Sequence, residues 1–264
     1  ANSIEMGRLE KLKNRKLPES EYTTTMKDDG NILEIENLHS YFFTDQGVVK
    51  AVDGVYFNVP LNSTVGVVGE SGCGKSVTSL SLMQLVQAPQ GQIVSGSIRF
   101  EGTDYSYDEK RNKIPIYKLD ENGNQVFDEK GKPVIETNEF GVPQYKTERK
   151  VFDIAKMPKY EMHRIRGNLV AMIFQEPMTS LNPVFTIGNQ LDEVTLLHVE
   201  GATKEYAKKR SIEMLELVGI AMPENIYKRY PHELSGGMRQ RVMIAMALIL
   251  SLIHISEPTR RVVI

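Results

Sequence analysis

The residues Gly-Glu-Ser-Gly-Cys-Gly-Lys-Ser at positions 69–76 constrain this chain more than any other stretch. They fit the pattern G-x-x-x-x-G-K-[ST], a loop that wraps the phosphates of a nucleotide. Glycines let successive backbone N–H groups turn toward an anion, Lys75 brings a cation to the phosphates, and the Ser76 hydroxyl can join the ligands of Mg²⁺. The pattern therefore predicts a site for a nucleoside triphosphate with Mg²⁺. The residues expected to form it are Gly69, Glu70, Ser71, Gly72, Cys73, Gly74, Lys75, Ser76 and Val77.

The neighbours of this loop strengthen the prediction. The apolar run at residues 65–68 is typical of a buried strand, and residues 76–83 are typical of the following helix. The N-terminus of that helix would point at the phosphates and add its dipole. The alternative is a glycine-rich turn that binds nothing. We disfavour it because strand, loop, lysine, hydroxyl and helix follow in the order that the site requires.

Composition excludes few functions. The chain has 264 residues, is 41% hydrophobic and 25% charged, and carries a net charge of −2, as soluble globular proteins do. The chain has no overall excess of basic residues, so its composition gives no indication that it binds nucleic acid. Cys73 is the one cysteine, so no disulfide can form within the chain, which suits a reducing cytosol. The longest apolar stretch, residues 242–255, is shorter than the ~20 residues of a membrane span, and no secretory signal is visible. We therefore expect the chain not to cross a membrane.

The part of the chain before the loop contains a polar stretch and then strands. Residues 1–30 are polar and mixed in charge, which is typical of a mobile tail or a short solvated helix. Two β-like runs follow at residues 32–38 and 54–59. Between them, Tyr41, Phe42 and Phe43 either stack on an adenine ring or pack within a strand.

After the first helix, residues 96–102 predict a strand, and the composition then changes. Residues 103–150 are rich in Lys, Asp, Glu, Asn, Gly and Pro, so we expect a surface excursion without chemistry. Turn signals around residues 124–127 and 132–135 indicate a small hairpin within it. The region has no histidine and no cysteine, so no metal-ligand spacing occurs there.

A second candidate site feature follows a short helix at residues 160–165. Residues 168–174 are rich in apolar side chains and predict a strand, and Gln175 comes directly after it. A glutamine at the carboxyl end of a strand lies where open α/β sheets bind ligands. Its carbonyl could reach Mg²⁺ or an attacking water. Helices are then predicted at residues 186–199 and 203–218.

A second helix end directed at an anion is predicted at Leu-Ser-Gly-Gly-Met-Arg-Gln, residues 234–240. Ser235 is a plausible N-cap, Gly236 and Gly237 expose backbone N–H groups, and an apolar helix runs from Met238 to residue 250. Either the chain binds two phosphate groups, or the second helix end serves the nucleotide of a partner chain.

These three motifs, in this order, resemble the ATP-binding subunit of an ABC transporter. Two segments resemble those of the oligopeptide/dipeptide permease branch. They are Phe-Gln-Glu-Pro-Met-Thr-Ser-Leu-Asn-Pro at residues 174–183 and Tyr-Pro-His-Glu at 230–233. The resemblance covers residues 31–103 and 158–248. It implies an α/β P-loop NTPase with a RecA-like core, an antiparallel β subdomain and a helical subdomain at residues 177–235, within an ATP-binding domain spanning 31–250.

The resemblance also implies roles for individual residues. Phe42, or alternatively Tyr41, would stack on adenine, and Lys75 and Ser76 would take the phosphates and Mg²⁺. Gln175 would contact the metal and couple it to transport. The residues that would close over the ATP of an opposite subunit are Ser235, Gly236, Gly237 and Gln240.

The implied function is the coupling of ATP hydrolysis to import of di- and oligopeptides through a membrane permease. The implied partners are a second ATPase subunit (identical or different), permease subunits and, indirectly, a substrate-binding protein, with no nucleic acid. The protein would then lie at the cytoplasmic face of the cell membrane. Two alternatives remain, a soluble ABC ATPase not tied to transport and a nucleotide-binding module without turnover.

The chain also departs from the family pattern. Residues 103–157 are longer than the usual connection and are interpreted as an insert. An Asp-Glu pair expected after the second helix would fall at Pro258 and Thr259, and Glu257 stands close by without the aspartate. We interpret residues 251–264 as an artefactual tail on a truncated protein. We therefore expect this chain to bind ATP and hardly hydrolyse it, unless Glu257 acts as a displaced base.

Overall fold

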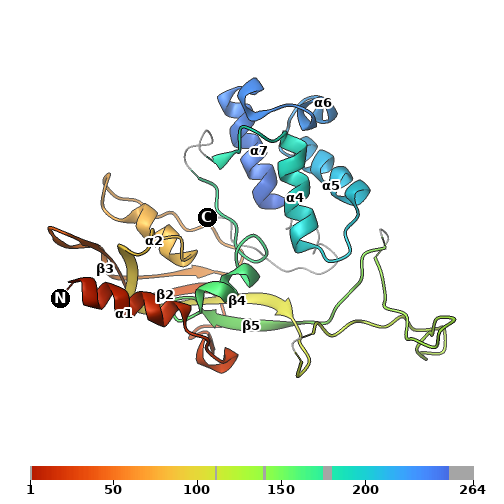
Figure 1. Cartoon of the computed structure of the whole chain (residues 1–264), viewed down its shortest axis with the longest axis horizontal. Coiled ribbons are helices and arrows are strands. Elements are labelled where there is room, and N and C mark those ends of the chain that lie inside the picture. The colour runs from red at the N-terminus through yellow and green to blue at the C-terminus, as the bar shows by residue number, and fades with distance from the viewer. Residues whose placement is uncertain (1, 111, 139–140, 175–179, 250–264) are drawn as a thin grey trace.

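The computed structural model describes residues 2–110, 112–138, 141–174 and 180–249. Strands dominate the first part of the chain and helices the last (Figure 1). The strands are β1 Thr23–Thr24, β2 Asn31–Thr44, β3 Gly47–Pro60, β4 Gly91–Tyr105 and β5 Thr147–Asp153. The helices are α1 Asn2–Asn14, η1 Glu19–Glu21, α2 Lys75–Leu82, η2 Lys159–Arg164, α4 Ile187–His198, α5 Lys204–Leu217, α6 Pro223–Tyr227, η3 Pro231–Glu233 and α7 Gly236–Leu248.

The five strands form one antiparallel sheet in the order β1-β5-β4-β2-β3. The β2–β3 hairpin closes at the pair Thr44↔Gly47 with a two-residue connection between them. Apolar residues of β2, β4 and β5 are buried in one core with residues of α2 and η2, for example Leu33, Ile98 and Met162. The runs predicted at residues 32–38, 54–59 and 96–102 all lie within these strands.

The N-terminal segment packs against the sheet. Tyr22 is 0% exposed and belongs to the same core, and β1 pairs with β5 directly after it. Leu9 of α1 is also buried, and α1 contacts β2 and β4. Helix α1 agrees with the short solvated helix, one of the two alternatives predicted for residues 1–30, because Leu9 is its one buried residue. The rest of the segment differs from a mobile tail, because one large aromatic side chain can anchor a polar segment.

Helices α4 to α7 gather in a second group with its own apolar core, away from the sheet (Figure 1). Thr186 caps α4 by accepting a hydrogen bond from the Asn189 backbone N–H, and Thr203 caps α5 through that of Tyr206. The predicted helices at 186–199 and 203–218 agree with α4 and α5. Helix α7 packs with this group, so the group extends past the predicted limit at residue 235 to Ile249.

The excursion between β4 and β5 projects from the sheet as a chain of small hairpins (Figure 1). The pair Phe127↔Pro133 confirms the predicted hairpin, and similar pairs enclose the turns at Asp108, Asp120 and Asn138. Each aspartate at these turns accepts backbone N–H groups two and four positions later at 2.8–2.9 Å. Local hydrogen bonding therefore shapes a segment that has little apolar core of its own.

The excursion is shorter than the predicted insert. It is also anchored to the helical group. Strand β4 continues to Tyr105 and β5 begins at Thr147, so both flanks of the predicted insert at 103–157 belong to the sheet. Val142 is 4% exposed within the helical core, and Glu200 accepts hydrogen bonds from Lys113 and Tyr145. The excursion thus contacts the helical group as well as the sheet.

Two segments predicted as strands do not form strands. Val68 is 92% exposed in the run at 65–68, and residues 168–174 contribute only isolated bridges such as Arg166↔Val170. A strand forms where a neighbour pairs its backbone N–H and C=O groups. Within the described residues the named strands pair with one another, and none of them pairs with these two segments.

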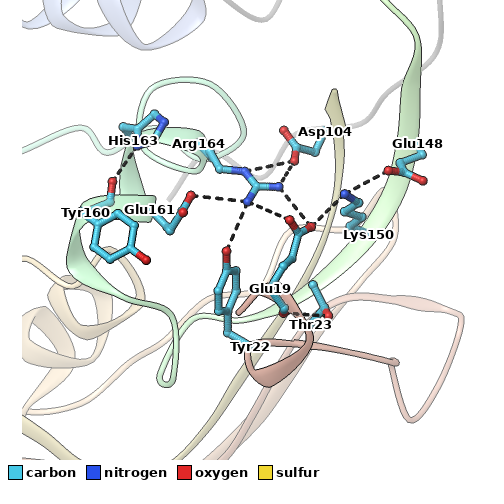
Figure 2. Close-up of polar contacts among 10 residues, drawn as sticks. All are labelled: Glu19, Tyr22, Thr23, Asp104, Glu148, Lys150, Tyr160, Glu161, His163 and Arg164. Carbon is cyan, nitrogen blue, oxygen red and sulfur yellow. Dashed lines mark hydrogen bonds and ion pairs between the residues drawn. The ribbon is translucent and has the colours of Figure 1, made fainter. Parts of the chain in front are cut away.

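A buried ionic cluster joins the N-terminal segment, the sheet and η2. Figure 2 shows the Arg164 guanidinium between the carboxylates of Asp104, Glu161 and Glu19. Lys150 of β5 binds Glu19 at 2.8 Å and completes the cluster. Arg164 and Asp104 are almost fully buried, so water does not solvate their charges. Each charge is instead stabilised by the opposite charge of the other.

Candidate functional site

The predicted phosphate loop lies between residue 68 and the N-terminus of α2. Gly74 is the N-cap of α2 with φ +96°, and Gly72 has φ +81°. Both are left-handed conformations that glycine adopts without strain. Lys75 begins the helix, so its backbone N–H and those after it point toward the loop. The sequence of turn and helix agrees with the prediction, although the preceding residues are not a strand.

Gly74 also permits a close approach between the loop and the sheet. A Cβ atom at this position would lie 2.3 Å from the carbonyl oxygen of Ala51 in β3. Any other residue would therefore clash with backbone, which cannot give way as a flexible side chain can. The contact fixes the N-terminal end of α2 against β3.

The Lys75 ammonium lies over its own loop. Its Nζ donates to the carbonyl oxygens of Gly69 at 2.7 Å and Glu70 at 2.6 Å, and it lies 3.5 Å from Cys73 Sγ. Carbonyl oxygens thus hold the cation where the pattern predicts phosphate oxygens. An anion at this place would meet the ammonium, the loop N–H groups and the N-terminal end of the α2 dipole. These residues fit a phosphate group.

The fit to a metal ion is less complete. Ser76 is exposed in the first turn of α2 and offers one hydroxyl. No group of three His, Cys, Asp or Glu that could hold a metal occurs among the residues that the structure describes. Gln175 and Glu257 lie outside the described residues.

A cavity of about 620 Å³ lies beside the loop, between α2 and the β2–β3 face. Lys75 and Ser76 belong to its lining, and most of the other lining residues are apolar, for example Ile35, Phe57 and Val67. Desolvating a phosphate among such side chains is costly. The loop, and not this cavity, is therefore the candidate phosphate site.

The aromatic cluster places its members in different surroundings. The Tyr41 hydroxyl donates to Asp53 at 2.6 Å, and Lys50 Nζ lies 5.4 Å from the Tyr41 ring centroid. The hydrogen bonds from Tyr41 and His39 lower the pKa of Asp53 to about 2. Phe42 is half-buried, and a Cβ atom at Gly91 would lie 2.9 Å from its ring. Lys50 thus occupies a face of Tyr41, whereas the Phe42 ring packs beside Gly91. Phe43 is buried.

The second predicted helix end is open to solvent. Ser235 caps α7 by accepting a hydrogen bond from the Met238 backbone N–H at 3.4 Å, which agrees with the predicted N-cap. Gly236, Gly237 and Gln240 are exposed, and a Cβ atom at either glycine would have nothing within 4 Å. Another molecule can therefore approach the backbone of the first turn of α7 closely.

The two helix ends belong to different parts of the molecule (Figure 1). Residues of α2 pack in the core of the sheet, and residues of α7 pack in the helical core. The structure brings the phosphate loop together with β3 and does not bring it together with Ser235.

Sequence reasoning did not single out the residues that hold α2 in place. Ser40 Oγ lies 2.7 Å from Ser81 Oγ of α2, and Arg166 donates to the backbone carbonyls of Met83 and Gln84. These partners are 41 to 83 positions apart in the chain. No local motif marks them, because only the folded chain makes them neighbours.

Comparison with protein families places residues 52–256 in a match to the family described as ABC transporter. The chain is 41% identical to the oligopeptide transport ATP-binding protein AppD of Bacillus subtilis (strain 168), over 86% of this chain and 55% of that protein. It is 39% identical to OppD of the same organism, over 86% of this chain and 50% of that protein. The glutathione import ATP-binding protein GsiA of Escherichia coli (strain K12) is 37% identical over 84% of this chain and 28% of its own length. The chain thus spans about half the length of the first two relatives.

A solved structure shows the same fold. The dimeric ATP-binding cassette MJ0796, in a post-hydrolysis state bound to ADP and Pi, matches with a TM-score of 0.55 at 20% identity. The match covers 83% of this chain and 70% of that chain. The expected fold class, an α/β P-loop cassette with an antiparallel β portion, is thereby confirmed. No helix of the described residues is both long and apolar enough to span a bilayer.

Proposed function

Since this chain belongs to the ABC transporter family, we propose that it is the ATP-binding part of an importer of peptides. The observation that carries the proposal is the phosphate loop, with two left-handed glycines and the Lys75 ammonium at the N-terminus of α2. Relatives named for oligopeptide transport support peptides as the transported substrate. Because the chain spans about half of those relatives, transport is proposed for the whole protein.

The chain's residues would act mainly by positioning and by electrostatics. Binding would require Lys75 to leave the Gly69 and Glu70 carbonyls and to donate to the β- and γ-phosphates instead. Ser76 would supply a metal ligand, and Gln175 is proposed as a second. When bound, Mg²⁺ would neutralise charge on the phosphates. Phe42 is the proposed platform for adenine.

The open end of α7 supports a dimer. Ser235, Gly236, Gly237 and Gln240 would approach the nucleotide held by a second ATPase subunit, because their own chain keeps them apart from its phosphate loop. In this arrangement each nucleotide lies between two subunits. The pair would act on permease subunits from the cytoplasmic face of the membrane, with a substrate-binding protein as an indirect partner.

The test of nucleotide binding is the variant Lys75→Ala. We expect it to remove most ATP affinity, because it deletes the cation at the loop. Equilibrium binding of a fluorescent ATP analogue measures the effect. Lys110→Ala, which removes an exposed lysine from the excursion, is the matched control. Equal affinity of the two variants would refute the assignment of the loop.

The transport proposal needs its own experiment. Cells whose gene for the whole protein carries Lys75→Ala should take up labelled oligopeptide more slowly than wild-type cells, while uptake of an unrelated sugar stays unchanged. Unchanged oligopeptide uptake would favour an ABC ATPase not tied to peptide import.

The dimer proposal is tested by Ser235→Arg. The bulky cation should leave ATP binding by the isolated chain intact and should prevent ATP-dependent association of the whole protein, followed by light scattering. If ATP binding by the isolated chain fails as well, α7 serves the nucleotide of its own chain.

A further inference from the structure

Helix α2 carries the phosphate loop and has few turns with which to hold it. It runs for eight residues, Lys75–Leu82, and buries Thr78, Ser81 and Leu82. Its Ser81 Oγ lies 2.7 Å from Ser40 Oγ of the sheet. So short a helix depends on tertiary contacts for its placement.

The C-terminal end of α2 is held by one arginine. Arg166 Nε donates to the Met83 carbonyl at 2.8 Å, and its Nη2 donates to the Gln84 carbonyl at 2.9 Å. A helix leaves its last carbonyls without intrahelical partners, and these are the negative end of its dipole. Met83 is the C-cap of α2 and Gln84 follows it, so the fork of charged donors holds the carbonyls of the two residues that come directly after the helix.

Gln84 ties the same end to the core. Its Nε2 donates to the carbonyls of Ile154 at 2.6 Å and Met157 at 2.8 Å. Its backbone is left-handed, with φ +48°, where the chain leaves the helix. The end of α2 is therefore gripped from two directions.

Arg166 is itself held firmly by its surroundings. Ile165 is 0% exposed, and the Arg166 backbone N–H donates to Met162 at 2.9 Å. Two positions earlier, Arg164 is anchored in the buried cluster with Asp104 (Figure 2). The guanidinium of Arg166 thus extends from a rigid base.

We propose that Arg166 is a positioning residue for the phosphate loop and acts through α2. The inference rests on the proposed nucleotide binding. The loop end of α2 is located by the contact of Gly74 with Ala51, and the other end by Arg166. Without Arg166 the helix can pivot about the Gly74 contact. The first-turn N–H groups and Ser76 then lose their alignment with a bound phosphate, although the core remains buried.

The test compares Arg166→Met with Arg166→Lys and with the control Arg99→Met in the full 264-residue chain. Arg99 is a partly buried arginine that binds Glu36 at 2.7 Å in the sheet. Affinity for a fluorescent ATP analogue and the thermal unfolding midpoint are measured for each variant. Affinity is read well below every midpoint, so that loss of stability alone does not change it.

We expect Arg166→Met to weaken binding at least about tenfold, which corresponds to the loss of one charge-assisted hydrogen bond or more. Arg166→Lys, which keeps the charge and can reach one carbonyl, should recover part of the affinity. Arg99→Met should lower the midpoint and leave affinity within about twofold of wild type.

A lowered midpoint with unchanged affinity in Arg166→Met would overturn the proposal and reduce Arg166 to a structural role. If Arg166→Met does not fold, Arg166→Lys and Gln84→Leu decide, because each loosens the same helix end, and unchanged affinity in both would overturn it. Failure of the wild-type chain to bind the analogue would refute the proposed function itself. The two failures are therefore distinguishable.

Discussion

At the scale of single residues, the loop at 69–76 combines features that can be read from the sequence with one that cannot. The residue types predict a phosphate site, and Gly72 and Gly74 adopt the left-handed conformations that such a loop needs. The requirement for glycine at position 74 has a second cause, the 2.3 Å approach to the Ala51 carbonyl. The position of the Lys75 ammonium over its own carbonyls is likewise a property of the folded loop.

The aromatic cluster yields a prediction at this scale. Phe42→Ala should weaken binding of an ATP analogue by about 1–3 kcal/mol if its ring stacks on the base. Tyr41→Phe should have little effect on affinity, because it removes only the hydroxyl that binds Asp53. Titration of both variants with the analogue, and with one that lacks the base, separates stacking from phosphate binding. Unchanged affinity in Phe42→Ala, together with a loss of affinity in a third variant, Tyr41→Ala, would assign the platform to Tyr41 instead.

At the scale of elements, the excursion between β4 and β5 shows how a polar segment acquires a defined shape. Its turns repeat an aspartate or asparagine that accepts backbone N–H groups within the same turn. Its residue Val142 packs in the helical core, and its residues Lys113 and Tyr145 donate hydrogen bonds to Glu200 of the helical group. The composition of residues 103–150 predicts the exposure of the turns and gives no sign of this contact.

The two parts of the excursion should respond differently to removal. Replacing residues 118–134 by Asn-Gly joins the paired residues Tyr117 and Ile135 and deletes mainly exposed side chains such as Phe127. We expect the thermal midpoint to change by no more than about 2 °C. Val142→Ala should instead lower the free energy of unfolding by about 1.5 kcal/mol, because it removes two buried methyl groups. If both changes shift the thermal midpoint by the same amount, Val142 does not anchor the excursion.

At the scale of the whole molecule, two apolar cores and a set of buried charges decide stability. The sheet core includes Tyr22 from the N-terminal segment, and the helical core includes α7. Some charged groups are buried in pairs, as Arg164 is with Asp104. Such pairs make stability depend on pH.

Glu34 provides a test of that dependence. Burial alone would raise its pKa, but the backbone N–H groups of Lys27 and Asp28, the Asn31 amide and Arg99 outweigh it and lower the pKa below 4.5. A carboxyl whose pKa is lower in the folded state stabilises fully above its unfolded value and loses that contribution as pH falls through the folded value. Glu34→Gln should therefore destabilise the chain at pH 7, and its difference from wild type should shrink below about pH 4.5. Urea unfolding across this range measures it, and a difference that is constant with pH would contradict the assignment.

Local patterns in the sequence were sufficient for much of this protein. The turn of the phosphate loop, helices α4, α5 and α7, the N-cap Ser235 and parts of strands β2, β3 and β4 follow from residue types and periodicity. The family follows from the order of three motifs. These features depend on residues that are close together in the chain, so they can be predicted from the sequence alone.

Only the tertiary structure decided the features that depend on distant partners. The apolar run at 65–68 is not a strand, because the described residues offer it no neighbour to pair its backbone groups. Tyr22 turns an apparently polar N-terminal stretch into part of the core, and Val142 anchors the excursion. The grip of Arg166 on α2 joins residues 82 and 83 positions apart. Packing between residues that are distant in the chain decides each of these features. Local periodicity in the sequence does not predict such packing.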